Sequence, residues 1–243
     1  DNVIDLNDLP VLQAQMTNQR YRGIGLGTFG WHHLLALKGV KWESSQAVDY
    51  CDSLYEEIAY HTIKASCELA DEKGVYPYFD GSEWSSGEYF EKRGYSSMRW
   101  AELKDKVSAK GIRNGYLMAV APNSSTSIIA GSSASIDPIF RLEYSEEKKD
   151  YKIPVTAPDL SPKTTWYYKT AYHVDQHWSV KQNVKRQRHI DQGISFNLYV
   201  RNDIKAKDLL ELHLDAWNSG LKTTYYVRST SVSDFEECES CHS

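Results

Sequence analysis

The chain has 243 residues, of which 41% are hydrophobic and 25% charged, and its formal net charge is −5. This globular composition allows a buried core, and a negative net charge gives no general field for holding a phosphate backbone. No run approaches the ~20 apolar residues that a membrane span needs, and the first residues lack the basic start and apolar centre of a signal peptide. We therefore expect a cytoplasmic protein that binds neither nucleic acid nor membranes.

The first motif along the chain is a glycine-rich stretch, Gly25-Leu-Gly27-Thr-Phe-Gly30, which matches the dinucleotide-binding fingerprint. Glu43 lies roughly where a ribose-binding acid would be sought. The fingerprint requires a buried apolar strand before it, and Arg20-Tyr-Arg-Gly-Ile is a poor candidate for one. We favour a glycine-rich turn packed closely against other backbone, with a nicotinamide site as the alternative.

A long helix is predicted from Ser44 and Ser45 to Lys73-Gly74, because apolar residues recur at helical spacing throughout this segment. Cys51 and Cys67 belong to this pattern, which indicates small buried hydrophobic residues rather than reactive thiols. Residues 75–100 are rich in aromatic residues, Gly, Ser and Glu without a clear period. They predict a loop fixed by aromatic packing, with room for a short helix.

A strand, a loop and a helix are predicted in succession after Gly115. The apolar run 116–121 is followed by a polar loop and then by Ile128-Ile-Ala. The loop supplies backbone N–H groups and hydroxyls that can hold an anion without a lysine. Ser and Thr before a helix are more often simple caps, so the loop alone is a weak signal. The candidate anion-binding residues are Pro122, Asn123, Ser124, Ser125, Thr126 and Ser127.

His173-Val-Asp-Gln-His177 places two imidazoles four residues apart, which on a helix brings them to one face, as metal ligation requires. The Glu of the metalloprotease motif is absent, and no third ligand is identifiable from the sequence. The favoured interpretation is therefore a polar helix face, with a metal site as the alternative.

Residues 194–200 are predicted to form a strand, a helix follows that Gly220 ends, and Leu221 to Arg228 form a second strand. A strand, a helix and a strand with short links imply a parallel pair with a crossover, which indicates an α/β fold. Tyr225 and Tyr226 could relay an electron with its proton, because phenols are oxidisable and form hydrogen bonds. Neighbours on a regular strand face opposite sides, so stacking of the two rings requires a bend at the strand end.

The last residues, 229–243, are Ser-rich and acidic and predict a flexible tail. Cys238 lies 12 positions after Tyr226, so an extended tail could reach ~40 Å. Cys238 and Cys241 suit a redox dithiol, because two such thiols can close a small disulfide and exchange it. An inert terminal pair is the alternative. The match to a haem attachment motif, completed by His242, lacks a surrounding pocket, and zinc lacks two further ligands.

Longer blocks of sequence decide between these interpretations. They resemble the C-terminal part of a class I ribonucleotide reductase large subunit, in which the Ser/Thr loop, the tyrosine pair and the terminal dithiol occur in the same order. The resemblance implies the later portion of a ten-stranded α/β barrel in residues 1–228, followed by a flexible redox-active tail in 229–243. The blocks are Asn114–Pro122, Ser133–Phe140, Arg186–Gln192 and Ser195–Tyr199.

By this resemblance, Pro122 to Ser127 hold the phosphates of a ribonucleoside diphosphate. Tyr225 and Tyr226 match the pair that passes a radical in from the small (beta) subunit, where the metal or radical cofactor is expected; none is expected in this chain. Cys238 and Cys241 match the dithiol that re-reduces the active site and is itself reduced by thioredoxin or glutaredoxin.

The chain departs from a complete enzyme of this family. The thiyl-forming cysteine and the reducing pair belong to an earlier portion of the family's sequence, and Cys51 and Cys67 do not match them. Asp1 stands where a Met would begin a full chain, so we expect a fragment or a processed chain that is inactive alone and needs a separate N-terminal portion. The alternative function is a non-catalytic, barrel-completing assembly module.

Overall fold

The computed structural model describes residues 1–147 and 152–230, so Cys238, Cys241 and the predicted tail beyond Thr230 lie outside the described residues. The chain divides into two compact units. Unit 1 comprises Asp1–Leu26, Ser53–Ala119 and Arg188–Gln192, and unit 2 comprises Gly27–Asp52, Val120–Gln187 and the chain from Gly193 onwards. Within the described ranges, none of the helices combines the length and apolar composition that crossing a bilayer requires.

The predicted long helix is confirmed as α4, Ser45–Lys73, of 29 residues. Its start is capped by Ser44, whose Oγ accepts a hydrogen bond from Ala47 N at 3.1 Å. Cys51 and Cys67 are buried, free thiols on this helix, as predicted. Burial raises the pKa of Cys51 to about 11, which keeps it a neutral thiol at physiological pH.

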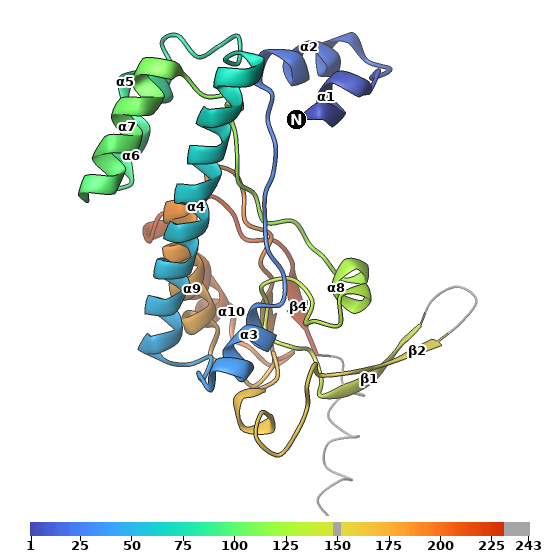
Figure 1. The fold of residues 1–243 in the computed structure, drawn as a ribbon. Helices are drawn as coiled ribbons and strands as arrows, with labels where there is room; N and C mark the ends of the chain where they lie inside the picture. Colours follow the sequence, from blue (N-terminus) through green and yellow to red (C-terminus); the bar gives the residue numbers. More distant parts are fainter. Residues whose placement is uncertain (148–151, 231–243) are drawn as a thin grey trace, which may run out of the picture. The chain divides into compact units, whose positions relative to one another are not determined.

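Unit 1 is helical and packed largely by aromatic side chains. The predicted loop at 75–100 contains more helix than expected, because stacked ring pairs fix short helices that have little propensity of their own. The ring centroids of Trp84 and Tyr89 lie 3.6 Å apart, and those of Tyr95 and Trp100 lie 3.7 Å apart. Figure 1 shows α5, α6 and α7 side by side. Besides part of α4, the helices of unit 1 are α1 Asn2–Leu6, α2 Leu12–Tyr21, α5 Glu83–Ser86, α6 Glu88–Lys92 and α7 Met98–Lys110.

Unit 2 mixes helices and strands. Its β1 and β2 form an antiparallel hairpin, and β3 pairs in parallel with β4 across the intervening α10. This pair confirms the predicted strand–helix–strand crossover and the α/β class. Figure 1 shows the hairpin and β4. The elements are α3 Trp31–Lys38, α8 Ser125–Ile129, β1 Glu143–Glu147, β2 Lys152–Thr156, the 3-10 helix η1 Thr165–Tyr167, α9 Gln176–His189, β3 Leu198–Val200, α10 Ala206–Asn218 and β4 Val227–Ser229.

The predicted strand at 116–121 is present only as two isolated parallel bridges, from Met118 to Leu26 and from Val120 to Ile194. The strands predicted at 194–200 and 221–228 are likewise shorter, since β3 begins at Leu198 and β4 at Val227. An apolar run becomes a regular strand only where a neighbouring backbone pairs with it in register over several residues. The local pattern therefore located the extended segments correctly but overestimated the length of their pairing.

Candidate functional site

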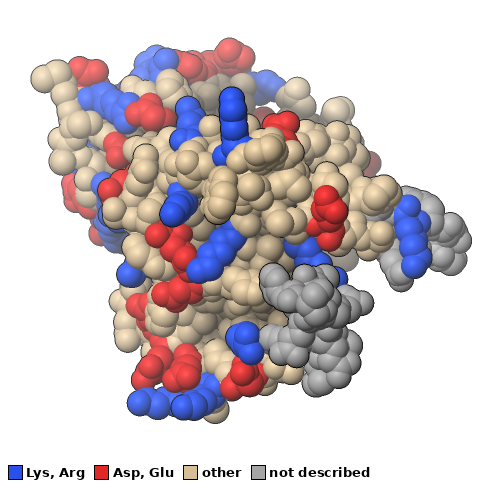
Figure 2. All heavy atoms as spheres, turned by 90° about the horizontal axis from the view of Figure 1, so that it is seen from below, with Lys and Arg blue, Asp and Glu red and all other residues tan. Residues whose placement is uncertain are grey.

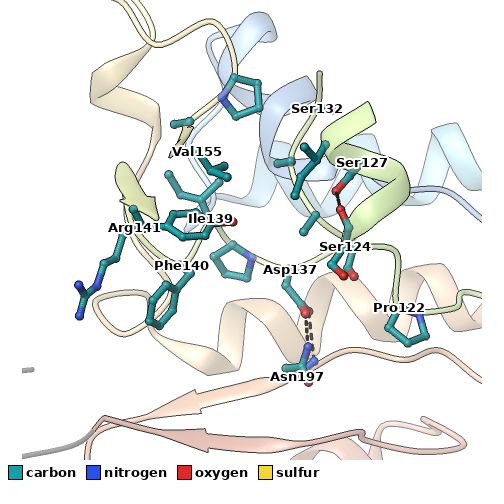
Figure 3. A pocket seen from close by; sticks show the side chains of 18 of the residues that line it. Pro122, Ser124, Ser127, Ser132, Asp137, Ile139, Phe140, Arg141, Val155 and Asn197 are labelled. Atoms are coloured by element: carbon teal, nitrogen blue, oxygen red, sulfur yellow. Dashed lines mark hydrogen bonds between the residues drawn. The ribbon is translucent and has the colours of Figure 1, made fainter. Parts of the chain in front are cut away.

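A cavity of about 320 Å³ lies within unit 2, and it is bordered by both the Ser/Thr loop, Pro122–Ser127, and Tyr225. Pro122, Ser124 and Ser127 line it from the loop, and Tyr225 lines it from the segment before β4. Figure 3 shows this cavity with Ser124 and Ser127 facing one another, and with Asp137 pointing towards Asn197, which directly precedes β3. Two candidate motifs about 100 residues apart in the sequence therefore border one space.

The Ser/Thr loop is held by hydrogen bonds within its own unit. Ser127 Oγ donates to Ser124 O at 2.6 Å, and Asn123 N donates to Ser135 Oγ at 3.1 Å. Ser132 N donates to Ser127 O at 2.9 Å, which fixes the chain that follows α8. The side chain of Ser124 makes no capping hydrogen bond to α8, although Ser124 is the residue at the cap position. The simple-cap interpretation therefore does not account for this serine.

The loop residues differ in their access to the cavity. Pro122, Ser124 and Ser127 line it, whereas the other three candidates are not among the lining residues. Asn123 turns its amide back on the chain, because its Nδ2 donates to Ala121 O at 2.9 Å. The hydroxyls of Ser124, Ser127 and the following Ser132 thus line this wall, although the single proton of Ser127 Oγ is donated to Ser124 O.

Tyr225 and Tyr226 form a ring pair with centroids 4.0 Å apart and an interplanar angle of 41°. Both residues precede β4, so the chain at this point is not a regular strand and the predicted bend is present. Hydrogen bonding with Tyr226 raises the pKa of Tyr225. The other tyrosine dipeptide behaves differently, because Tyr168 is buried and donates its hydroxyl to Pro158 O at 2.7 Å.

A buried carboxylate, Asp137, lines the same cavity and was not singled out from the sequence. Its Oδ1 accepts a hydrogen bond from Asn197 N at 3.1 Å, and its Oδ2 accepts one from Asn197 Nδ2. Burial raises the pKa of Asp137 to about 6, although the Asn197 bonds oppose this shift. The available signal was an acid inside a run of small and apolar residues, Ser133–Phe140.

Two further polar features surround the cavity. The Arg228 guanidinium, which lines it, lies 5.6 Å from the centroid of the Tyr226 ring. Ser132 Oγ lies 3.0 Å from His33 Nδ1, and Asp159 Oδ2 lies 2.9 Å from Nε2 of the same ring. The histidine thus orients the serine hydroxyl at the rim of the cavity. On the molecular face drawn in Figure 2, Lys and Arg side chains are interspersed with Asp and Glu.

The His173–His177 motif does not form the helix face that the sequence predicted. His173 precedes α9, which begins at Gln176, so the prediction of two imidazoles on one helix face is wrong; the turn before the helix separates them. The Nδ1 atom of His177 instead contacts Asp215 Oδ2 at 2.9 Å. Across residues 1–147 and 152–230, no group of three or more His, Cys, Asp or Glu residues is placed to hold a metal ion.

The glycine-rich stretch is a closely packed turn, as favoured from the sequence. Gly30 has φ 78°, and a Cβ added there would collide with Ser132 Oγ. A Cβ on Gly25 would lie 3.3 Å from Ala119 Cβ. Glu43, the candidate ribose ligand, forms an ion pair with Lys169 at 2.7 Å. These contacts give the glycines and the acid structural roles.

Comparison with known proteins identifies the family to which this chain is similar. A family model described as ribonucleotide reductase, barrel domain, matches residues 1–157 and 143–227. The subunit alpha of ribonucleoside-diphosphate reductase from Treponema pallidum is 50% identical over 243 residues, which are 100% of this chain and 29% of that protein. The corresponding subunit from Helicobacter pylori strain J99 is 41% identical, covering 96% of this chain and 31% of that protein. The corresponding subunit from Chlamydia pneumoniae is 31% identical, covering 98% of this chain and 27% of that protein. The chain therefore spans less than a third of the length of these relatives.

Proposed function

Because the chain belongs to the ribonucleotide reductase large-subunit family and corresponds to its C-terminal part, we propose that it serves the radical-based reduction of ribonucleoside diphosphates to deoxyribonucleotides. The observation that carries this proposal is the shared cavity: the Ser/Thr loop and Tyr225 border the same space. A substrate held by the loop would thereby lie near the proposed end of the tyrosine relay.

In this proposal, the Ser/Thr loop binds the phosphates of the substrate. Phosphate oxygens accept hydrogen bonds, and the cavity wall presents the hydroxyls of Ser124 and Ser132, while the proton of Ser127 Oγ is donated to Ser124 O. The volume of about 320 Å³ is at the lower end of the range for small-molecule sites. The Arg228 guanidinium adds a positive charge to the same lining.

The tyrosine pair provides the radical's route. When Tyr226 carries a phenoxyl radical, Tyr225 gives it a hydrogen atom, so that the O–H bond of Tyr225 breaks while that of Tyr226 forms. The ring centroids are 4.0 Å apart, which suits a direct transfer. The initiating oxidation comes from the metal or radical cofactor of a small (beta) subunit, and Tyr226, with 53% of its surface exposed, is accessible to that partner.

The tail dithiol restores the reductant. Cys238 and Cys241 would deliver two electrons and two protons to a disulfide in the active site and become a disulfide themselves. Thioredoxin or glutaredoxin then reduces that disulfide. The support for this step is the sequence spacing and the family order, because both cysteines lie outside the described residues.

We also propose that the reaction requires the N-terminal portion of the large subunit. Unit 1 carries an apolar groove of about 560 Å³, lined in part by Ile24, Leu26, Ile58 and Leu117. Leu26 has 46% of its surface exposed. An open apolar surface of this kind favours cover by further polypeptide. The same groove supports the second candidate function, a barrel-completing module without catalytic residues of its own.

Reconstitution distinguishes these functions. The chain is combined with the N-terminal portion, the small subunit, thioredoxin and a ribonucleoside diphosphate, and deoxynucleotide formation is measured. We expect turnover only from the complete mixture. Appreciable turnover by this chain with the small subunit alone would contradict the proposed dependence. Equal turnover by complexes with intact and Tyr225→Phe chains would support the non-catalytic module.

A further inference from the structure

The segment 133–137 is hydrogen-bonded to the Ser/Thr loop at one end and to Asn197, which directly precedes β3, at the other. At its loop end, Asn123 N donates to Ser135 Oγ at 3.1 Å, and Ser135 N donates to Asn123 O at 3.4 Å. Ser135 has φ 52°, in the left-handed region that residues with a Cβ rarely adopt. This end is therefore maintained at the cost of an unfavourable backbone conformation, which indicates that its position is determined by the contacts around it.

At its other end, the segment is attached to Asn197 through Asp137. The carboxylate accepts one hydrogen bond from the backbone N–H of Asn197 and a second from its side-chain Nδ2 (Figure 3). Each residue is only 5% exposed. Asp137 therefore restrains the backbone and the side chain of Asn197 together.

Asn197 lies between the two points from which the tyrosine pair is held. Tyr225 N donates to Phe196 O at 2.9 Å, and Leu198 N donates to Tyr226 O at 2.9 Å. A displacement of Asn197 therefore moves the hydrogen-bonding partners of both tyrosines at once. The bonds of the segment form a continuous connection from the loop to the ring pair.

We propose that Asp137 is a positioning residue that acts through Asn197 to set the geometry of the Tyr225–Tyr226 pair relative to the Ser/Thr loop. This inference rests on the proposed function. A buried carboxylate costs free energy unless its oxygens are hydrogen-bonded, and an amide would occupy nearly the same volume at a lower desolvation cost. What an amide lacks is a second acceptor oxygen, and both oxygens of Asp137 accept from Asn197.

The test uses the reconstituted complex and separates substrate binding from radical transfer. Asp137→Asn keeps one acceptor for Asn197 N but places a donor against Asn197 Nδ2. We expect the rate of a single turnover to fall about tenfold, while KM for the ribonucleoside diphosphate stays within about twofold. Ser135→Ala should do the reverse, raising KM and sparing the single-turnover rate at saturating substrate.

A reciprocal double variant supplies the rescue. In Asp137→Asn with Asn197→Asp, the new amide donates to the new carboxylate, and the backbone N–H of residue 197 still has an acceptor. We expect its single-turnover rate to return to within about threefold of the original. Asp52→Asn is the matched control, because Asp52 is a carboxylate of the same unit that pairs with Lys185 outside the cavity.

Two results would overturn the inference. The first is an Asp137→Asn complex with an unchanged single-turnover rate. The second is a double variant that is folded by circular dichroism but no faster than Asp137→Asn; this comparison stands even where the single variant folds poorly. Tyr225→Phe is measured alongside: if that variant is active, the proposed relay fails. If it is inactive while Asp137→Asn is unaffected, only the positioning role fails.

Discussion

The Ser/Thr loop and the tyrosine pair border the same cavity but are held in different ways. The loop is fixed through both backbone and side chains, as in the Asn123–Ser135 and Ser124–Ser127 contacts. The tyrosines are fixed mainly through their backbones, and 43% of Tyr225 and 53% of Tyr226 remain exposed. The difference indicates that the loop is held in place by the chain itself, whereas the position of the rings depends mainly on the backbone that carries them.

The largest effect on turnover should come from substitutions of Tyr225 and Tyr226. Tyr225→Phe or Tyr226→Phe keeps the ring but removes the oxidisable hydroxyl, so we expect the reconstituted complex to lose single and multiple turnover alike. Deoxynucleotide yield per complex measures this. Tyr167→Phe, in the other tyrosine dipeptide, should retain activity. Product formation by either member of the pair as Phe would exclude an obligatory relay.

A second large effect distinguishes the proposed role of the tail cysteines from that of the tyrosine pair. Replacing Cys238 or Cys241 by Ser should spare a single turnover and block thioredoxin-driven cycling, because only re-reduction is lost. Cys67→Ala is the control: this thiol is buried and its pKa is raised, so cycling should persist. Normal cycling in the tail variants would refute the role assigned to the tail.

The sequence alone predicted part of this fold and part of the candidate site. Local patterns found α4, the β3–α10–β4 crossover and both motifs that border the cavity. They overestimated the strand at 116–121, because strand length depends on partners distant in sequence. They missed Asp137 for a related reason: its role requires Asn197, 60 residues away, and nothing local reveals that pairing.

An intermediate effect is expected from His32, whose protonation at low pH should lower the free energy of unfolding. His32 is buried: its Nδ1 accepts from Ile139 N at 2.9 Å, and its Nε2 lies 2.9 Å from Tyr167 O. Burial lowers the pKa of His32 to about 4. The stability that the neutral ring contributes is therefore complete above its unfolded pKa of ~6.5 and is lost as pH falls towards 4, by about 3 kcal/mol.

Denaturant unfolding of the chain against pH measures this contribution. The readout is the difference in unfolding free energy between the original chain and His32→Phe, because the raised pKa of Asp137 acts in the opposite direction over nearly the same range. We expect that difference to shrink on acidification from pH 7 to 4. A pH-independent difference would mean that protonation of His32 does not destabilise the folded chain.

The smallest effect is expected within the loop itself. Ser127→Ala removes the bond to Ser124 O and one hydroxyl from the cavity wall. We expect KM for the ribonucleoside diphosphate to rise about tenfold with kcat within about twofold, since binding and not radical transfer is affected. Steady-state kinetics of the complex decide this. A fall in kcat at unchanged KM would mean that Ser127 contributes to radical transfer and not to substrate binding.

The central claim is that one cavity serves both the substrate and the radical, and a structure of the reconstituted complex with a bound ribonucleoside diphosphate tests it most directly. We predict phosphate oxygens at ~2.7–3.2 Å from donors of Pro122–Ser127, with Tyr225 bordering the same cavity. A diphosphate bound away from this loop would contradict the claim.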